Sequence, residues 1–317
     1  MSDGAHLLIP FAACSAQGCR QALQGLALPR LATLLARLAP VAVDGADEMT
    51  LSTPPERVLA RECGLSAADG RIPWAAWQLQ QAGRDPGGKA WAWITPCHWR
   101  VATDHITLSQ PQELQLDAQA SQALLAAMRP FFEQDGIGIE YHAPMLWLAS
   151  GEVFRPLASA SLDRVVGRSI DAWMPRAPKA APLRRLQQEM QLLLYTHPIN
   201  DQRVRDGLLP VNSFWVSGSG ALPASHGPAP PPGLQIAHGL REPALLEDWP
   251  AWAAAWQQLD ARECGQLLGA LDQGRAVTLT LCGDRSARTW SGRQTGLWPR
   301  FMSVFSRKPA SIELEKL

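Results

Sequence analysis

The sequence has little or none of several features that mark particular classes of protein. Its 317 residues carry 29 basic and 29 acidic side chains, so no charge excess directs the chain toward nucleic acid or an anionic membrane. No apolar run reaches the ~18 residues that span a bilayer. No basic segment precedes the first apolar stretch, as one would in a signal peptide. We therefore predict a cytoplasmic protein without a nucleic-acid or membrane partner.

The cysteine pattern and the glycine-rich turns exclude two further classes of site. There is no C-x-x-C pair, which predicts reduced thiols rather than a disulfide framework or a zinc site. The six cysteines are Cys14, Cys19, Cys63, Cys97, Cys264 and Cys282. The turn at 84–89, RDPGGK, lacks the G-x-x-x-x-G-K-S/T spacing of a loop that binds nucleotide phosphates.

Tyrosine is nearly absent, with 2 residues, whereas tryptophan occurs 13 times. Several of the tryptophans lie in three clusters along the sequence, which are Trp74/Trp77, Trp91/Trp93/Trp99 and Trp249/Trp252/Trp256. Their spacing favours burial in the core, where tryptophan covers a large area and needs one partner for its N–H group. The alternative is an exposed aromatic surface that binds a ligand or a protein partner.

Two stretches predict α/β units. Residues 6–13, HLLIPFAA, predict a buried strand, and residues 28–38 predict a helix with proline near its start. Later, an amphipathic helix from residue 183 ends before Pro198, and residues 211–216 predict a buried strand. In open α/β sheets ligands bind beyond the carboxyl ends of strands, so Ser217 to Gly220 marks a predicted site.

The segment HPINDQRVRDGLLPVNSFWVSGSG resembles a motif of archaeal-type cofactor-independent phosphoglycerate mutases, which reads roughly H-x-V-N-x-x-R-x-x-x-G-x-x-P-A-N. The matching residues are His197, Asn200, Arg203, Gly207, Pro210, Asn212 and Gly220. The whole chain also resembles a proteobacterial family named for the regulatory protein RpfE and labelled phosphoglycerate mutase-like. The first strand, followed by LPRLATLLARL, is similar to the opening of the alkaline phosphatase superfamily.

These resemblances imply an α/β fold with an alkaline phosphatase-like, mostly parallel sheet flanked by helices. Residues 1–90 and 152–317 would form this core. Residues 91–151 show a β-α-β-β order and resemble the small inserted α+β domain of the mutases. Residues 221–233, ALPASHGPAPPPG, predict a proline-rich loop.

The chemistry of the resembled enzymes places strong demands on the sequence. Those mutases use two metal ions and a serine that is transiently phosphorylated, and in the superfamily the first strand ends in a metal-binding aspartate. Here Pro10, Phe11 and Ala12 stand at that position, and their side chains cannot bind a metal. A late D-x-x-x-H and a late Asp-His pair are also missing. We therefore predict a degenerate phosphoglycerate mutase-like protein that is regulatory or binds a ligand or partner, with no cofactor.

Polar side chains around the resembling motif and the predicted cleft are the expected ligand-binding residues. They are His98, Asp104, Arg168, His197, Asn200, Arg203, Asn212, Ser213 and Ser217. Such groups suit an anionic small molecule, and a regulatory protein partner is the other prediction. The asparagines would alternatively cap turns and satisfy backbone groups, and Asp104-His105 would alternatively have only a structural role.

A second function stays open, namely an active metal-dependent phosphoglycerate mutase that transfers phosphate through a serine. It would require Mn or Zn held by side chains that converge to within about 2.0–2.3 Å of the metal. The candidate ligands are Asp44, Asp47, His226, His238 and Asp284.

Overall fold

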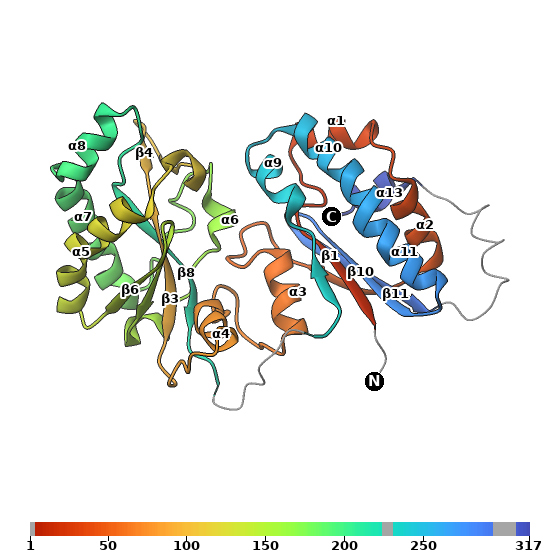
Figure 1. Ribbon diagram of the computed structural model, residues 1–317, viewed down its shortest axis with the longest axis horizontal. Helices are drawn as coiled ribbons and strands as arrows, with labels where there is room; N and C mark the ends of the chain where they lie inside the picture. Colours follow the sequence, from red (N-terminus) through yellow and green to blue (C-terminus); the bar gives the residue numbers. More distant parts are fainter. Residues whose placement is uncertain (1–3, 224–230, 294–308) are drawn as a thin grey trace. The chain divides into compact units, whose positions relative to one another are not determined.

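The computed structural model describes residues 4–223, 231–293 and 309–317 (Figure 1). The chain forms two compact units, and the first is assembled from three separate segments. The first unit comprises Met1–Glu48, Thr53–Cys63 and Pro230–Leu317, and the second comprises Met49–Ser52 and Gly64–Ala229. In the described residues, no helix is both long and apolar enough to cross a membrane.

The first unit is built on a five-stranded mixed sheet with the order β2-β11-β10-β1-β9. The strands are β1 (Ala5–Ile9), β2 (Ala39–Gly45), β9 (Leu234–Ile236), β10 (Ala276–Cys282) and β11 (Ser286–Arg293). Strand β1 pairs in parallel with β10 and with β9, whereas β11 runs antiparallel to both β10 and β2. The prediction of a mostly parallel sheet is therefore corrected to a mixed one, because the short 283–285 turn permits only antiparallel pairing of β10 and β11.

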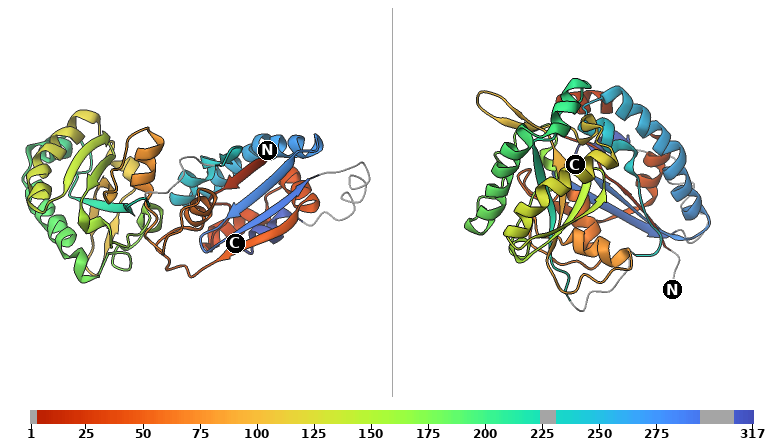
Figure 2. Two further views of the ribbon diagram at one scale, coloured as in Figure 1. Left: turned by 90° about the horizontal axis from the view of Figure 1, so that it is seen from below. Right: turned by 60° about the vertical axis from the view of Figure 1, so that its left-hand side comes forward.

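Helices cover both faces of this sheet (Figures 1 and 2). The elements of the first unit are α1 (Gln17–Gln24), α2 (Pro29–Arg37), α3 (Pro54–Glu62), η4 (His238–Leu240), α9 (Arg241–Leu245), α10 (Trp249–Leu259), the π-helical η5 (Asp260–Cys264), α11 (Gly265–Asp272) and α13 (Ala310–Leu314). Leu7 and Ile9 of β1 pack with α1, α2, α10 and α11, while Leu8 faces Val58 of α3. This alternation is the period of two that a strand imposes.

The helix predicted at residues 28–38 is confirmed as α2, and its first turn is capped by a distant side chain. Its N-cap position is Leu28, which has no capping group. Instead, the buried Asp260 carboxylate accepts hydrogen bonds from the Leu31 N–H group at 2.7 Å and the Arg30 N–H group at 3.2 Å. The π-helical turn η5 thus supplies the negative charge that favours a helix N-terminus.

The second unit contains a four-stranded antiparallel sheet with the order β6-β7-β3-β8. Its strands are β3 (Trp91–Cys97), β6 (Gly138–Ala143), β7 (Leu146–Ser150) and β8 (Ser213–Gly220), with a separate hairpin of β4 (Trp99–Val101) and β5 (Ile106–Leu108). Its helices are α4 (Trp74–Gln81), η1 (Pro111–Leu114), α5 (Ala118–Gln134), η2 (Glu152–Phe154), α6 (Leu162–Val165), η3 (Pro178–Ala180), α7 (Ala181–Tyr195) and α8 (Pro198–Arg205).

The second unit is larger than the predicted inserted segment, 91–151. Strand β8 completes its sheet by pairing with β3, and α7 packs on the same face as α5. The strand expected at 211–216 thus lies in an antiparallel sheet, so Ser217 to Gly220 are part of the strand and not a loop beyond its carboxyl end. The proline-rich loop predicted at 221–233 falls largely outside the described residues.

Candidate functional site

The two parallel strands β1 and β10 end side by side in the first unit, with Ile9 paired to Leu281. Beyond β1, Phe11 adopts a left-handed backbone conformation with φ of 56°, which turns the chain toward α1. Beyond β10, residues 283–285 turn back into β11. Because ligands of open α/β sheets bind past the carboxyl ends of parallel strands, these two loops define the candidate site.

Two tryptophans of α10 hold the loop after β1. The indole N–H of Trp252 donates to the Phe11 carbonyl at 3.0 Å, and that of Trp256 donates to the Ala12 carbonyl at 3.1 Å. Both side chains are fully buried, and their rings meet edge to face at 6.3 Å. The prediction of buried packing is confirmed for these two residues, and their polar edges also satisfy the carbonyls of a strained turn.

A serine and an aspartate join the two loops. The Asp284 carboxylate oxygen Oδ2 accepts hydrogen bonds from the Ser15 N–H group at 2.9 Å and from the Ser15 hydroxyl at 2.6 Å. The Arg20 guanidinium donates to the Ser15 carbonyl. A cavity of about 340 Å³ opens here, lined by Ala13, Cys14, Ser15, Arg20, Leu23, Asp284, Arg285, Ser286, Leu314, Glu315, Lys316 and Leu317.

Two cysteines meet at the wall of this cavity. Cys14 is half-buried in the loop, and Cys19 is buried at the third position of α1, where its sulfur accepts a hydrogen bond from the Cys14 N–H group at 3.2 Å. The Cys19 thiol and the Ala16 N–H group lower the pKa of Cys14 by hydrogen bonding to its sulfur, against burial and nearby carboxylates. Hydrogen bonding to Cys14, together with burial, raises the pKa of Cys19. The C-x-x-x-x-C spacing fits no standard metal pattern, so sequence reasoning missed this pair.

Cationic and anionic side chains both line the cavity. Arg20 and Arg285 line it with the carboxylates of Asp284 and Glu315, and Lys316 also lines it while pairing with Glu313. The Arg285 side chain is half exposed, with its Nε atom 3.7 Å from the Glu48 carboxylate. Guanidinium and ammonium groups are the usual partners of phosphate and carboxylate anions. The site therefore has the donors for an anionic ligand.

The same region does not fit a two-metal centre. Pro10, Phe11 and Ala12 follow β1 and offer no side-chain ligand. Asp44 lies in β2, where Arg57 and Arg61 contact its carboxylate at 2.7 and 2.9 Å. Within the described residues, no three His, Cys, Asp or Glu side chains lie close enough together to hold a metal ion. Of the other candidate ligands, His238 lies in η4, Asp284 binds Ser15, Asp47 follows β2, and His226 lies outside the described residues.

In the second unit, the polar residues of the resembling motif bind the protein's own backbone. Asn200 donates to the carbonyls of Leu194 at 2.8 Å and Val211 at 2.7 Å, and it accepts from the Val211 N–H group at 2.9 Å. Arg203 donates from Nε to the Leu209 carbonyl at 2.9 Å, and burial lowers the pKa of this guanidinium. These contacts fasten α8 to the segment that enters β8.

His98 and Asn212 make further hydrogen bonds to the segment that leads into β8 and to Trp99. The Asn212 amide bridges both backbone groups of Trp99, accepting from its N–H group at 2.7 Å and donating to its carbonyl at 2.9 Å. The His98 Nδ1 atom lies 2.8 Å from the Pro210 carbonyl. These polar groups are engaged with main chain, so the motif acts as a structural brace in the described residues.

The remaining predicted binding residues are dispersed. His197 caps α8 by accepting from the Ile199 N–H group at 3.3 Å. Asp104 pairs with His105 at 2.6 Å in the exposed turn between β4 and β5. Arg168 is exposed, and its carbonyl accepts from the Leu108 N–H group. Ser213 and Ser217 are buried within β8.

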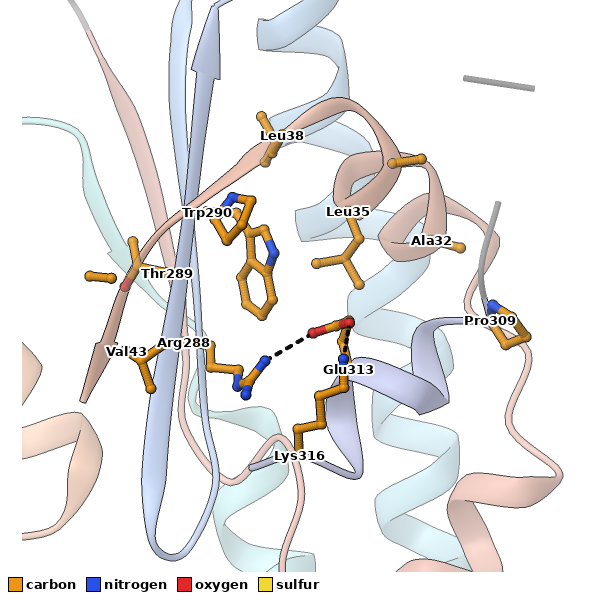
Figure 3. Close-up of a pocket in the computed structure, with 13 residues that line it drawn as sticks. Ala32, Leu35, Leu38, Val43, Arg288, Thr289, Trp290, Pro309, Glu313 and Lys316 are labelled. Carbon is orange, nitrogen blue, oxygen red and sulfur yellow. Dashed lines mark hydrogen bonds and ion pairs between the residues drawn. The ribbon is translucent and has the colours of Figure 1, made fainter. Parts of the chain in front are cut away.

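A second cavity of about 380 Å³ lies between α2, α13 and the strands β2 and β11 (Figure 3). Leu35, Leu38 and Trp290 form much of its wall. The Glu313 carboxylate binds Arg288 at 3.2 Å and Lys316 at 2.5 Å. The charged side chains of this second cavity pair with one another, and the rest of its wall is mainly apolar. An anionic ligand therefore fits the cavity beyond β1 and β10 better than this one.

Comparisons with known proteins reveal a distant relationship. No family model matches the chain. A 59-residue stretch is 36% identical to the 2,3-bisphosphoglycerate-independent phosphoglycerate mutase of Methanosarcina mazei, covering 19% of this chain and 15% of that protein. The match therefore spans less than a sixth of the length of its curated relative. Over this stretch the chain distantly resembles a cofactor-independent phosphoglycerate mutase.

Two solved structures are also similar over most of the chain, though at a low level. The cofactor-independent phosphoglycerate mutase from Thermoplasma acidophilum DSM 1728 is 13% identical, with a TM-score of 0.38, covering 94% of this chain and 91% of that one. The PH0037 protein from Pyrococcus horikoshii is 11% identical, with a TM-score of 0.40, covering 92% and 87%. The resemblance to the RpfE-type family stays a prediction.

Proposed function

We propose that this chain is a non-catalytic relative of the phosphoglycerate mutases that binds a small phosphorylated hydroxy acid and serves a regulatory role. Two observations support the proposal. The relative with the 59-residue match is named for its action on phosphoglycerate. The cavity beyond β1 and β10 brings together cationic side chains suited to phosphate and carboxylate groups.

The observation that carries the proposal is the set of side chains at this edge of the sheet. A two-metal phosphotransfer centre needs several carboxylates and imidazoles that converge on the transferred group. Here Arg20 and Arg285 line the cavity, while the carboxylate of Asp284 accepts two hydrogen bonds from Ser15. This arrangement suits an anion, and in the described residues it includes no cluster of carboxylates and imidazoles that would hold a pair of metal ions.

The first test is metal content and turnover on one sample. The purified protein is incubated with Mn²⁺ and Zn²⁺, desalted, analysed for bound metal and assayed for phosphoglycerate mutase activity. We expect neither stoichiometric metal nor turnover. Stoichiometric metal together with turnover would establish the alternative function, an active metal-dependent mutase, and overturn the proposal.

The second test is a prediction about Arg20. Titration calorimetry with 3-phosphoglycerate is expected to show binding, and Arg20→Gln is expected to weaken it about tenfold, the low end for a hydrogen bond to a charged group. Inorganic phosphate should compete. The matched control is Arg262→Gln, because Arg262 is an exposed arginine of the same unit that does not line the cavity and pairs with its neighbour Glu263. If both variants bind 3-phosphoglycerate with equal affinity, the cavity is not the binding site.

A further inference from the structure

We propose that Cys14 and Cys19 form a reversible thiol–disulfide couple, in which Cys14 reacts with a hydroperoxide and Cys19 resolves the product. The inference concerns covalent chemistry and does not depend on the proposed ligand. It rests on the contact between the two residues, on the position of Cys14 at a cavity wall, and on the burial of the other cysteines.

The geometry assigns different roles to the two thiols. Among the cysteines, all six of which lie in the described residues, only Cys14 is half-buried, and it lines the cavity beyond β1. Cys19 is 1% exposed, and its sulfur lies 3.2 Å from the Cys14 backbone nitrogen. A peroxide in the cavity therefore reaches Cys14 first, and Cys19 is already placed to attack it from the protein side.

The surroundings of Cys14 stabilise its thiolate. The Cys19 thiol and the Ala16 N–H group, at the start of α1, donate hydrogen bonds to its sulfur and lower its pKa. The carboxylates of Asp284 and Glu247 act in the opposite direction, as does burial. The net direction is downward, and the thiolate is the nucleophilic form of cysteine.

The other four cysteines lack this chemistry. Cys63, Cys97, Cys264 and Cys282 are all buried. Burial in apolar surroundings raises the pKa of each of these thiols. Buried cysteines of this kind are inert. Oxidation by a small amount of peroxide should therefore be selective for the pair at the start of α1.

The reaction balances in two steps. The Cys14 thiolate attacks one oxygen of hydrogen peroxide, the O–O bond breaks, and the products are a sulfenic acid and hydroxide, which takes up a proton to form water. The Cys19 sulfur then attacks the Cys14 sulfur. An S–S bond forms, the S–O bond breaks, and the hydroxyl leaves as water with the Cys19 proton. Two thiols and one peroxide thus give one disulfide and two waters, and an added dithiol reverses the change by exchange.

The experiment uses the full chain and mass spectrometry. Residues 1–20 contain no lysine or arginine before Arg20, so trypsin releases both cysteines in one peptide with no other cysteine. After treatment with hydrogen peroxide, we expect this peptide to lose two hydrogen atoms, to resist iodoacetamide and to regain both alkylation sites with dithiothreitol. Before oxidation, Cys14 should react with iodoacetamide at least roughly tenfold faster than the buried cysteines.

Single variants separate the two roles. In Cys19→Ser, dimedone should trap a sulfenic acid on Cys14, whereas Cys14→Ser should give no dimedone adduct. Cys63→Ser, which removes a buried thiol elsewhere in the first unit, should leave the disulfide unchanged. The proposal is overturned if peroxide leaves both thiols of peptide 1–20 open to alkylation, or if the oxidised sulfur lies on another cysteine. The wild-type digest decides this even if a variant fails to fold.

Discussion

Replacing Trp256 with alanine is expected to lower the free energy of unfolding by about 3–5 kcal/mol, the usual range for removing a large buried aromatic side chain. Trp256 has no exposed surface, and it packs in the core of the first unit with Trp252 and Leu279. The substitution also leaves the Ala12 carbonyl without the indole N–H that now donates to it. The loss should be measured by urea unfolding followed by circular dichroism.

The matched control is Trp256→Phe. It keeps most of the buried area but removes the hydrogen bond to Ala12, so we expect a loss of about 1–2 kcal/mol. If the indole holds the loop after β1, both variants should also speed the alkylation of Cys14. A loss of less than 1 kcal/mol for the alanine variant would contradict the packing described for α10.

Replacing Asn200 with alanine is expected to destabilise the protein by about 3 kcal/mol. The Asn200 amide makes three hydrogen bonds to the main chain of Leu194 and Val211, in a side chain that is only 4% exposed. Each such bond contributes about 1 kcal/mol, and its loss leaves a buried N–H or carbonyl group unsatisfied. Urea unfolding again provides the measurement.

Two further substitutions sharpen this result. Asn200→Asp keeps an acceptor for the Val211 N–H group but turns a carboxylate toward two carbonyls, so it should be at least as damaging. Gln202→Ala, on the exposed side of the same helix, should change stability by less than about 0.5 kcal/mol. If Asn200→Ala instead folds with normal stability and loses affinity for 3-phosphoglycerate, Asn200 belongs to a ligand site, as its position in the resembling motif first indicated.

The elements that the sequence predicted well carry strong local signals. Asp117 at the N-cap of α5 is such a signal, and its carboxylate accepts from the Ala120 N–H group at 2.7 Å. The last two strands of the β-α-β-β order expected for residues 91–151 form the hairpin of β6 and β7. Caps and tight hairpins are set by residues a few positions apart, so a single sequence contains the necessary information.

Strand order and the candidate site depend on residues far apart in the sequence. The pairing of β1 with β10, and the bridge from Ser15 to Asp284, join residues about 270 positions apart. No local pattern predicts which strands become neighbours. The sequence also does not show what the motif residues bind, because the side chains of Asn200 and Arg203 can donate hydrogen bonds to a ligand or to a backbone carbonyl equally well.

The division of the first unit into three chain segments has a consequence for the order of events during protein synthesis. Strand β1 is synthesised before both of its partners, because β9 follows about 230 and β10 about 270 residues later, and at 5–20 residues per second the interval to β10 is roughly 15–55 seconds. The second unit, mostly one continuous segment, is complete well before that. The apolar β1 segment therefore has no strand partner while the second unit is synthesised. During that interval a chaperone that binds nascent apolar segments can shield it.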